Sequence, residues 1–180
     1  AVIHQRGIVH RDLKPSNIFL PGGELARVKL LDFGIARRFA ATQAVTQTGM
    51  VLGTPEYMAP EQARGVRELL PAADFFSLGC ILYECLTGQP PFFADHLAAV
   101  LVRILFDEPK PVELLRPEAP TMLSALLAKM LKKDPSHRLS DASALRGELA
   151  KFDEVVELAL APTVARSVPF FQAFAAQEQR

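Results

Sequence analysis

Three short polar motifs constrain this chain more than any other feature of its sequence. H-R-D-L-K-P-S-N covers residues 10–17, D-F-G covers residues 32–34 and A-P-E covers residues 59–61. At average amino-acid usage each fixed residue matches by chance about one time in twenty, so three ordered matches are not a coincidence. Asp and Asn are common in turns and caps, and that interpretation would suffice for any one of them alone. The ordered set instead favours a catalytic site built from these loops.

An H-R-D-L-x-x-x-N loop, a D-F-G and an A-P-E, in this order, are the signature motifs of protein kinases. On these motifs the chain resembles the C-terminal lobe of a serine/threonine protein kinase of the bacterial, eukaryotic-like type, over residues 1–152. The resemblance implies an α+β, protein-kinase-like fold. Its mainly α-helical C-lobe would carry a short β-hairpin at the catalytic site, with the N-lobe missing from these residues. Residues 153–180 depart from the lobe, and we expect a C-terminal extension or linker there.

Phosphoryl transfer is mostly positioning plus charge neutralisation, and the resemblance gives the polar loop residues these tasks. Asp12 would accept or orient the proton of the attacking hydroxyl, and Lys14 would place a positive charge on the transferring phosphate. Asn17 and Asp32 would supply oxygen ligands to Mg²⁺ or Mn²⁺ and so hold ATP together with Lys14. Phe19 falls where the family has an apolar residue under the adenine ring, although an ordinary core residue fits equally well.

The resemblance also implies that some residues hold the site in shape. These are His10, Phe33, Gly34, Glu61, Asp74 and Arg138. His10 would pack beneath Phe33 of the D-F-G. Asp74 would hold the backbone of the catalytic loop, although a carboxylate near a helix N-terminus is also favoured by the helix dipole. Glu61 needs a cation if it is buried, because a lone buried carboxylate is costly, and Arg138 matches the family's partner.

Residues 35–58 lose periodicity and occupy the place of the activation loop. Arg11, directly before Asp12, is a cation that needs an anion. A phosphothreonine adds nearly two negative charges and pairs with arginine through charge-assisted hydrogen bonds. We therefore expect Thr46, Thr48 or both to be autophosphorylated in trans, and we interpret Thr42 as a solvated loop residue.

The segment from Gly53 to Gln62 is the best-matched block after the catalytic loop. The family threonine equivalent to Thr54 hydrogen-bonds Asp12 and Lys14, and it marks serine/threonine rather than tyrosine kinases. The block also favours protein substrates over a small-molecule kinase on the same fold. The partners implied are ATP, proteins with Ser or Thr hydroxyls, and the kinase itself in trans.

Hydrophobic periodicity and turn residues predict the secondary structure around the motifs. A hairpin is expected from strands over residues 18–20 and 28–31, joined by a turn at residues 21–23, which would place Asn17 and Asp32 at one end. Shorter elements are a helix end over residues 1–6 with Gly7 as its C-cap, and a strand at residues 8–9. Helices are expected over residues 72–87, 94–106, 120–131 and 140–152, with Ser140 as the N-cap of the last and a loop over residues 109–120.

Composition narrows the class of partner. Lys plus Arg and Asp plus Glu both total 20, so the zero net charge gives no reason to expect nucleic acid or an anionic membrane as a partner. The apolar runs at residues 75–86 and 97–106 are too short and interrupted to span a bilayer. Cys80 and Cys85 are expected to be reduced core residues, in keeping with a cytoplasmic signal-transduction enzyme.

A kinase also needs a glycine-rich loop, a strand lysine and a helix glutamate ahead of H-R-D, and residues 1–9 contain none of them. We therefore expect the complete protein to be an active kinase and residues 1–180 alone to be inactive. The alternative is a pseudokinase or partner-docking module. The intact catalytic-loop residues argue against that alternative.

Overall fold

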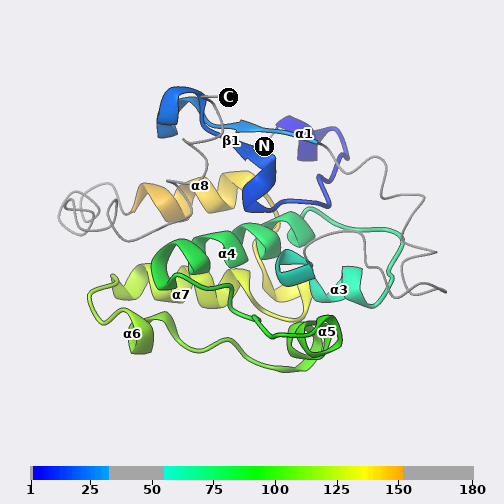
Figure 1. Cartoon of the computed structure of the whole chain (residues 1–180). Helices are drawn as coiled ribbons and strands as arrows, with labels where there is room; N and C mark the ends of the chain where they lie inside the picture. Colours follow the sequence, from blue (N-terminus) through cyan, green and yellow to red (C-terminus); the bar gives the residue numbers. More distant parts are fainter. Residues whose placement is uncertain (1, 33–54, 152–180) are drawn as a thin grey trace, which may run out of the picture.

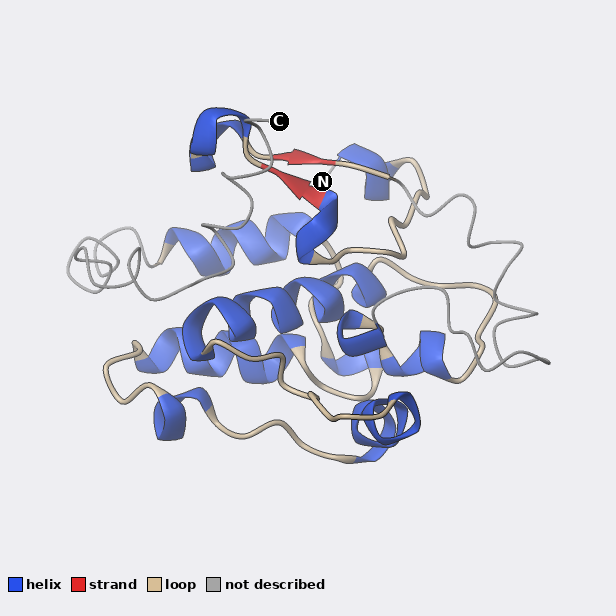
Figure 2. Cartoon of the chain, in the orientation of Figure 1, coloured by secondary structure: helices blue, strands red, loops and turns tan. Residues whose placement is uncertain are grey.

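The computed structural model describes residues 2–32 and 55–151. This part of the chain is mostly helical and contains one small two-stranded sheet (Figure 2). The mainly helical composition with a short hairpin agrees with the predicted fold class. The predictions that lie outside the described residues concern Phe33, Gly34, Thr42, Thr46, Thr48, Thr54 and residues 153–180.

The helix α4, Ala72–Thr87, lies near the middle of the molecule, with the hairpin on one side and α5 and α6 on the other (Figure 1). Its bounds are those predicted. A helix that is apolar on all sides must be surrounded by protein, and Phe75, Phe76 and Cys80 are almost completely buried. The helix ends at Gly88, whose φ of 83° lies in the left-handed region that favours glycine.

Helix α7, Thr121–Met130, packs against α4 at an unusually close approach. A Cβ atom at Gly79 would lie 3.0 Å from the Met130 Cβ and 3.1 Å from the Leu131 Cδ2. The absence of a side chain at Gly79 therefore lets the two helices lie close together. The buried apolar residues form two clusters, one that includes Phe76, Phe92 and Ile104 and one that includes Phe75, Met130 and Leu145.

The remaining helices are all shorter than α4. They are α1 (Val2–Gln5), α3 (Pro60–Ala63), α5 (Leu97–Phe106), α6 (Val112–Leu115) and α8 (Ala142–Ala150). Sequence analysis placed only a loop where α6 lies. The prolines that flank the single turn of α6 favour a loop prediction. Its Val112 is nevertheless buried in the core. The expected helix over residues 94–106 begins later, because His96 is extended and α5 starts at Leu97.

The prediction for the start of α8 was wrong by one residue. Asp141, not Ser140, is the N-cap, and its Oδ1 accepts hydrogen bonds from the backbone N–H groups of Ser143 at 2.7 Å and Ala144 at 2.9 Å. Ser140 instead donates its hydroxyl to the Asp141 carboxylate. Hydrogen bonds from the Ala144 N–H, the Ser140 hydroxyl and the Ser143 N–H hold the pKa of Asp141 below its ordinary value.

The hairpin consists of β1, Ile18–Phe19, paired antiparallel with β2, Lys29–Leu30. The register sets Ile18 opposite Leu30, so residues 17 and 31 lie opposite each other at the hairpin's open end. Two short 3₁₀ turns, Pro21–Gly23 and Leu25–Arg27, connect the strands. The strand expected at residues 8–9 is not formed, because that segment pairs with no other strand in the described chain and leads directly into the loop.

Both cysteines are free thiols, as predicted. Burial raises the pKa of the Cys80 thiol, which lies in the core, and raises that of the Cys85 thiol to about 11. Neither is therefore a thiolate near neutral pH. Among the described helices, none combines the length and the apolar character needed to cross a membrane.

Candidate active site

Residues Asp12, Lys14 and Asn17 meet at one carboxylate in the loop that follows α1. Lys14 Nζ lies 2.9 Å from Asp12 Oδ2. The Asn17 side-chain amide donates to the Asp12 backbone oxygen at 2.8 Å and to Asp12 Oδ2 at 3.2 Å. Asp12 and Lys14 keep 17% and 19% of their side-chain surface exposed, so the carboxylate is oriented by the loop and still reachable from solvent.

The hairpin brings Asn17 and Asp32 to the same end, as the sequence predicted. Asn17 precedes β1, Asp32 follows β2, and the Leu31 N–H donates to the Asn17 backbone oxygen at 2.9 Å. Both Asn17 side-chain hydrogen bonds leave from Nδ2, so Oδ1 lies on the opposite edge of the planar amide. Asp32 is exposed and has a left-handed φ of 48°, which Asp tolerates better than most residues.

An amide oxygen and a carboxylate are the donors that fit Mg²⁺, an ion that takes few protein ligands and completes its shell with water and substrate phosphates. Asn17 and Asp32 fit such an ion in type and in placement. Within residues 2–32 and 55–151 there is no competing cluster of three His, Cys, Asp or Glu side chains.

Asp74, in the first turn of α4, holds the backbone of the loop. Its Oδ2 accepts the His10 N–H at 2.8 Å and its Oδ1 accepts the Arg11 N–H at 2.9 Å. Arg11 has a φ of 69°, a left-handed conformation that is unfavourable for a residue with a side chain. The two hydrogen bonds from a 3% exposed carboxylate are what stabilise that conformation.

The imidazole of His10 is completely buried and connects the loop to the strand end that carries Asp32. Its Nε2 lies 3.0 Å from the Leu31 backbone oxygen, and the Asp12 N–H faces its Nδ1 at 3.4 Å. An oxygen acceptor at Nε2 and a donor at Nδ1 assign the proton to Nε2. The predicted packing of His10 under Phe33 lies outside the described residues.

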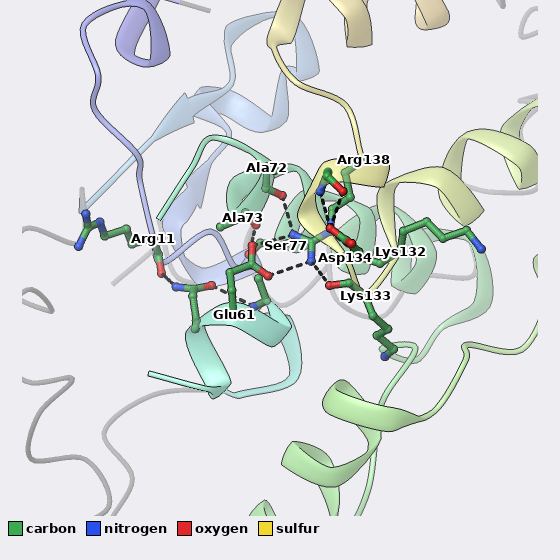
Figure 3. Close-up of polar contacts among 12 residues, drawn as sticks. Arg11, Glu61, Ala72, Ala73, Ser77, Lys132, Lys133, Asp134 and Arg138 are labelled. Carbon is green, nitrogen blue, oxygen red and sulfur yellow. Dashed lines mark hydrogen bonds and ion pairs between the residues drawn. The ribbon is translucent and has the colours of Figure 1, made fainter. Parts of the chain in front are cut away.

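The buried ion pair expected from the sequence is present between α3 and the segment before α8. Arg138 donates through both terminal nitrogens to the two Glu61 carboxylate oxygens, each at 2.8 Å. The guanidinium also donates to the backbone oxygens of Ala72, Lys132 and Lys133, as Figure 3 shows. This arrangement fixes α3 against α4, and the Arg11 side chain points away from it (Figure 3).

Comparison with known proteins agrees with this geometry. The family model described as "Protein kinase domain" matches residues 1–149. The chain belongs to the protein kinase family. The predicted resemblance is thereby confirmed.

The relatives are bacterial serine/threonine kinases. Serine/threonine-protein kinase PknB of Mycolicibacterium smegmatis is 44% identical over 153 residues, which are 84% of this chain and 24% of the relative. PknB of Mycobacterium leprae is 42% identical over 148 residues, 82% of this chain and 23% of the relative. Pkn1 of Myxococcus xanthus is 45% identical over 148 residues, 81% of this chain and 21% of the relative. The chain thus spans about a quarter of the length of these kinases.

Sequence analysis missed His4, a third donor to Asp74. His4 Nε2 lies 2.8 Å from Asp74 Oδ2, and its ring packs edge-on against Phe75. The buried Nδ1 has no hydrogen-bond partner within the described chain, so the proton lies on Nε2 and is donated to Asp74. The two residues are 70 positions apart, so no local pattern signals the contact.

A second contact that the sequence did not reveal joins Tyr57 to Glu84 on α4. The Tyr57 hydroxyl donates to Glu84 Oε2 at 2.6 Å. Burial raises the pKa of the Tyr57 phenol and also that of the Glu84 carboxyl, so the hydroxyl keeps its proton. The bond ties the 3₁₀ turn Pro55–Tyr57, which precedes the A-P-E motif, to the central helix.

Proposed function

We propose that the protein containing this chain is a serine/threonine protein kinase that transfers the γ-phosphate of ATP to Ser and Thr hydroxyls of other proteins. The observation that carries the proposal is the Asp12 carboxylate, oriented by Lys14 and Asn17 in a loop that Asp74 holds. Because phosphoryl transfer depends mainly on placement of charge, a rigid but accessible carboxylate beside a lysine suits it.

In this mechanism Asp12 orients the substrate hydroxyl and accepts its proton. Lys14, already 2.9 Å from Asp12, is close enough to contact the phosphoryl group as it passes to that hydroxyl. Asn17 and Asp32 would hold Mg²⁺, or Mn²⁺ in its place, and the ion would supply positive charge that neutralises the nucleotide phosphates. The half-buried Phe19 on β1 would lie under the adenine ring, and Thr54 would hydrogen-bond Asp12 and Lys14.

The finer organisation of the protein is part of the proposal. Residues 1–152 would form the C-terminal lobe, with Phe33 and Gly34 in its metal-binding loop, and residues 153–180 an extension or linker. The sequence of 180 residues contains no G-x-G-x-x-G segment, so this stretch alone is expected not to transfer phosphate. A cytoplasmic location and a role in signal transduction remain predictions.

Activation is expected to depend on phosphorylation of Thr46, Thr48 or both, in trans. Residues 35–55 contain no Asp or Glu and include Arg37 and Arg38, so an unmodified loop carries the same sign of charge as Arg11. One phosphate adds roughly −1.5 to −2 charge and reverses that balance. Mass spectrometry of the active protein, compared with an Asp32→Asn variant, tests this. Full activity with neither threonine phosphorylated would exclude the switch.

The function itself is tested with Asp12→Asn in the complete protein. Asparagine keeps the size and the hydrogen bond from Asn17 but cannot accept a proton. Phosphorylation of a Ser/Thr peptide should fall by about a hundredfold or more, since a general base contributes roughly 10²–10⁴. ATP binding, measured by calorimetry, should be little changed. A wild-type protein that binds partners and never transfers phosphate would instead indicate a pseudokinase.

A further inference from the structure

The peptide unit between Arg11 and Asp12 is held on its carbonyl edge by Gln62, a residue to which the sequence analysis gave no role. Gln62 Nε2 donates to the Arg11 backbone oxygen at 2.8 Å. Its Oε1 accepts the backbone N–H of Ala59 at 3.0 Å. The side-chain amide therefore connects the start of α3 to the catalytic loop, across 51 positions of sequence. The Arg11 carbonyl is drawn in Figure 3.

This peptide unit sets the direction in which the Asp12 side chain leaves the backbone. Rotation of its plane changes ψ of Arg11 and φ of Asp12, and it swings the Asp12 Cα–Cβ bond. On its other edge the Asp12 N–H faces His10 Nδ1 at 3.4 Å, a longer contact than the 2.8 Å from Gln62. Of these two contacts, the one from Gln62 is the shorter.

The same backbone carries the left-handed φ of Arg11, which is 69°. Asp74 fixes the N–H side of Arg11 at 2.9 Å and Gln62 fixes its carbonyl side, so both polar groups of this residue bond to side chains from other elements. A backbone in an unfavourable conformation persists only where its surroundings over-determine it. Removing one of the two contacts is expected to let this residue relax.

Gln62 is itself held in place by its neighbour. Glu61 makes the buried pair with Arg138, whose side chain is fully covered. Because Gln62 follows in the same turn of α3, that ion pair also holds the helix backbone from which the Gln62 side chain leaves. The anchoring of the A-P-E segment is thereby transmitted to the backbone beside Asp12.

We propose that Gln62 is a positioning residue for the catalytic base: its Nε2–H group holds the Arg11–Asp12 peptide plane and so aims the Asp12 carboxylate. This inference rests on the proposed kinase function and adds a determinant of its rate. A purely local role is the alternative, because a Gln at the third helical position commonly accepts the N-cap N–H. The two roles use different atoms of the amide, so they can be separated.

Gln62→Glu separates them. The ionised carboxylate keeps an acceptor for the Ala59 N–H but presents a second oxygen, not a donor, to the Arg11 carbonyl. Gln62→Met removes both contacts at similar size. Gln89→Glu is the matched control, since Gln89 is exposed in the loop after α4 and only its backbone atoms make hydrogen bonds in the described structure.

The experiment measures the single-turnover rate of phosphoryl transfer to a peptide in the complete protein at pH 8, together with ATP affinity and thermal unfolding. Gln62→Glu should lower the rate on the order of tenfold or more, because displacement of a catalytic group by about 1 Å can cost about 10²-fold. ATP affinity and unfolding temperature should stay close to wild type. Gln89→Glu should leave the rate unchanged.

The pH dependence of the transfer rate adds a measurement that a pure helix-capping role would not change. A protonated glutamic acid carries an O–H that can donate to the Arg11 oxygen, as the amide does. The ratio of the Gln62→Glu rate to the wild-type rate should therefore rise as the pH falls toward about 5, near the ordinary titration range of Glu. A Gln62→Glu rate equal to wild type at pH 8, with Gln62→Met impaired, would reduce Gln62 to a cap and overturn the proposal. Absence of transfer by the wild type would instead refute the kinase function.

Discussion

Two carboxylate–cation pairs in this molecule differ in burial and in the number of hydrogen bonds that join them. Glu61 and Arg138 are joined through two hydrogen bonds, each 2.8 Å, and keep 10% and 0% of their side-chain surface exposed. Asp12 and Lys14 share one 2.9 Å contact and keep 17% and 19% exposed. The first pair joins distant elements, whereas the second lies within one loop.

The difference shows how the same chemistry serves two purposes. A planar guanidinium with all its donors in use cannot change partners without leaving a buried charge uncompensated. A lysine ammonium on a flexible stem, partly in contact with water, can move from one anion to another at little cost. The buried pair is thus suited to holding the fold, and the partly exposed pair to a reaction in which a phosphate arrives and leaves.

The largest expected effect comes from breaking the buried pair on one side. Glu61→Gln or Arg138→Met should each lower the free energy of unfolding by about 3–5 kcal/mol, because the remaining charge is stranded. Denaturant unfolding of the complete protein measures this. The double variant should be less destabilised than the two single losses added together. If the two single losses simply add up in the double variant, Glu61 and Arg138 do not form an ion pair.

The partly buried pair, Asp12 and Lys14, should affect the rate more than the stability. Lys14→Met should lower the free energy of unfolding by less than the loss of Glu61 or Arg138, because Asp12 keeps contact with water and the hydrogen bond from Asn17. The rate of peptide phosphorylation should nevertheless fall on the order of 10²-fold, as expected when one charged donor is removed from a transition state. A variant that loses stability but keeps its rate would reverse the roles of the two pairs.

Lys133 provides a third cation that sharpens the comparison. Its Nζ lies 3.8 Å from the centre of the Phe92 ring and donates to the backbone oxygens of Ile104 at 2.7 Å and Arg103 at 3.2 Å. No carboxylate contacts it directly within the described residues. Burial, which outweighs the attraction of the more distant Glu108, lowers the pKa of this lysine to about 8.

The lowered pKa makes the contribution of Lys133 to stability depend on pH. Between about pH 8 and 10.5 the folded state has released this proton and the unfolded state still binds it, so stability rises with pH in that window. The contribution is lost as the pH falls through about 8. The free energy of unfolding of the wild type, measured relative to that of Lys133→Met, should increase from pH 7 to 10.5. A difference that is constant over this range would indicate that the ring and carbonyls hold the charged form.

Much of the fold could be predicted because local chemistry dictated it. An apolar run followed by Gly88 gave the bounds of α4, and the residues around Gly22 gave the hairpin. The N-cap of α8 was misplaced because Ser140 and Asp141 are adjacent and both are good capping residues. Only the direction of the chain entering the helix, which is set by tertiary packing, decides between them.

The site was predictable where a motif names its residues and not where a contact crosses the fold. Asp12 and Asn17 lie five positions apart in one motif. Glu61 and Arg138 could be paired only through the family resemblance. His4 reaches Asp74 over 70 positions and Gln62 reaches the Arg11 carbonyl over 51, and no spacing rule connects residues so distant.

The separation of Glu61 from Arg138 has a consequence for the order of events during folding. The pair closes a span of 77 positions, and contacts of such long range cost more chain entropy to form than local ones. We expect the pair to form after the transition state for folding. Its loss should then accelerate unfolding and leave the folding rate nearly unchanged, which is the behaviour of an interaction that provides kinetic stability. The same ion pair would therefore set how long the catalytic loop stays assembled.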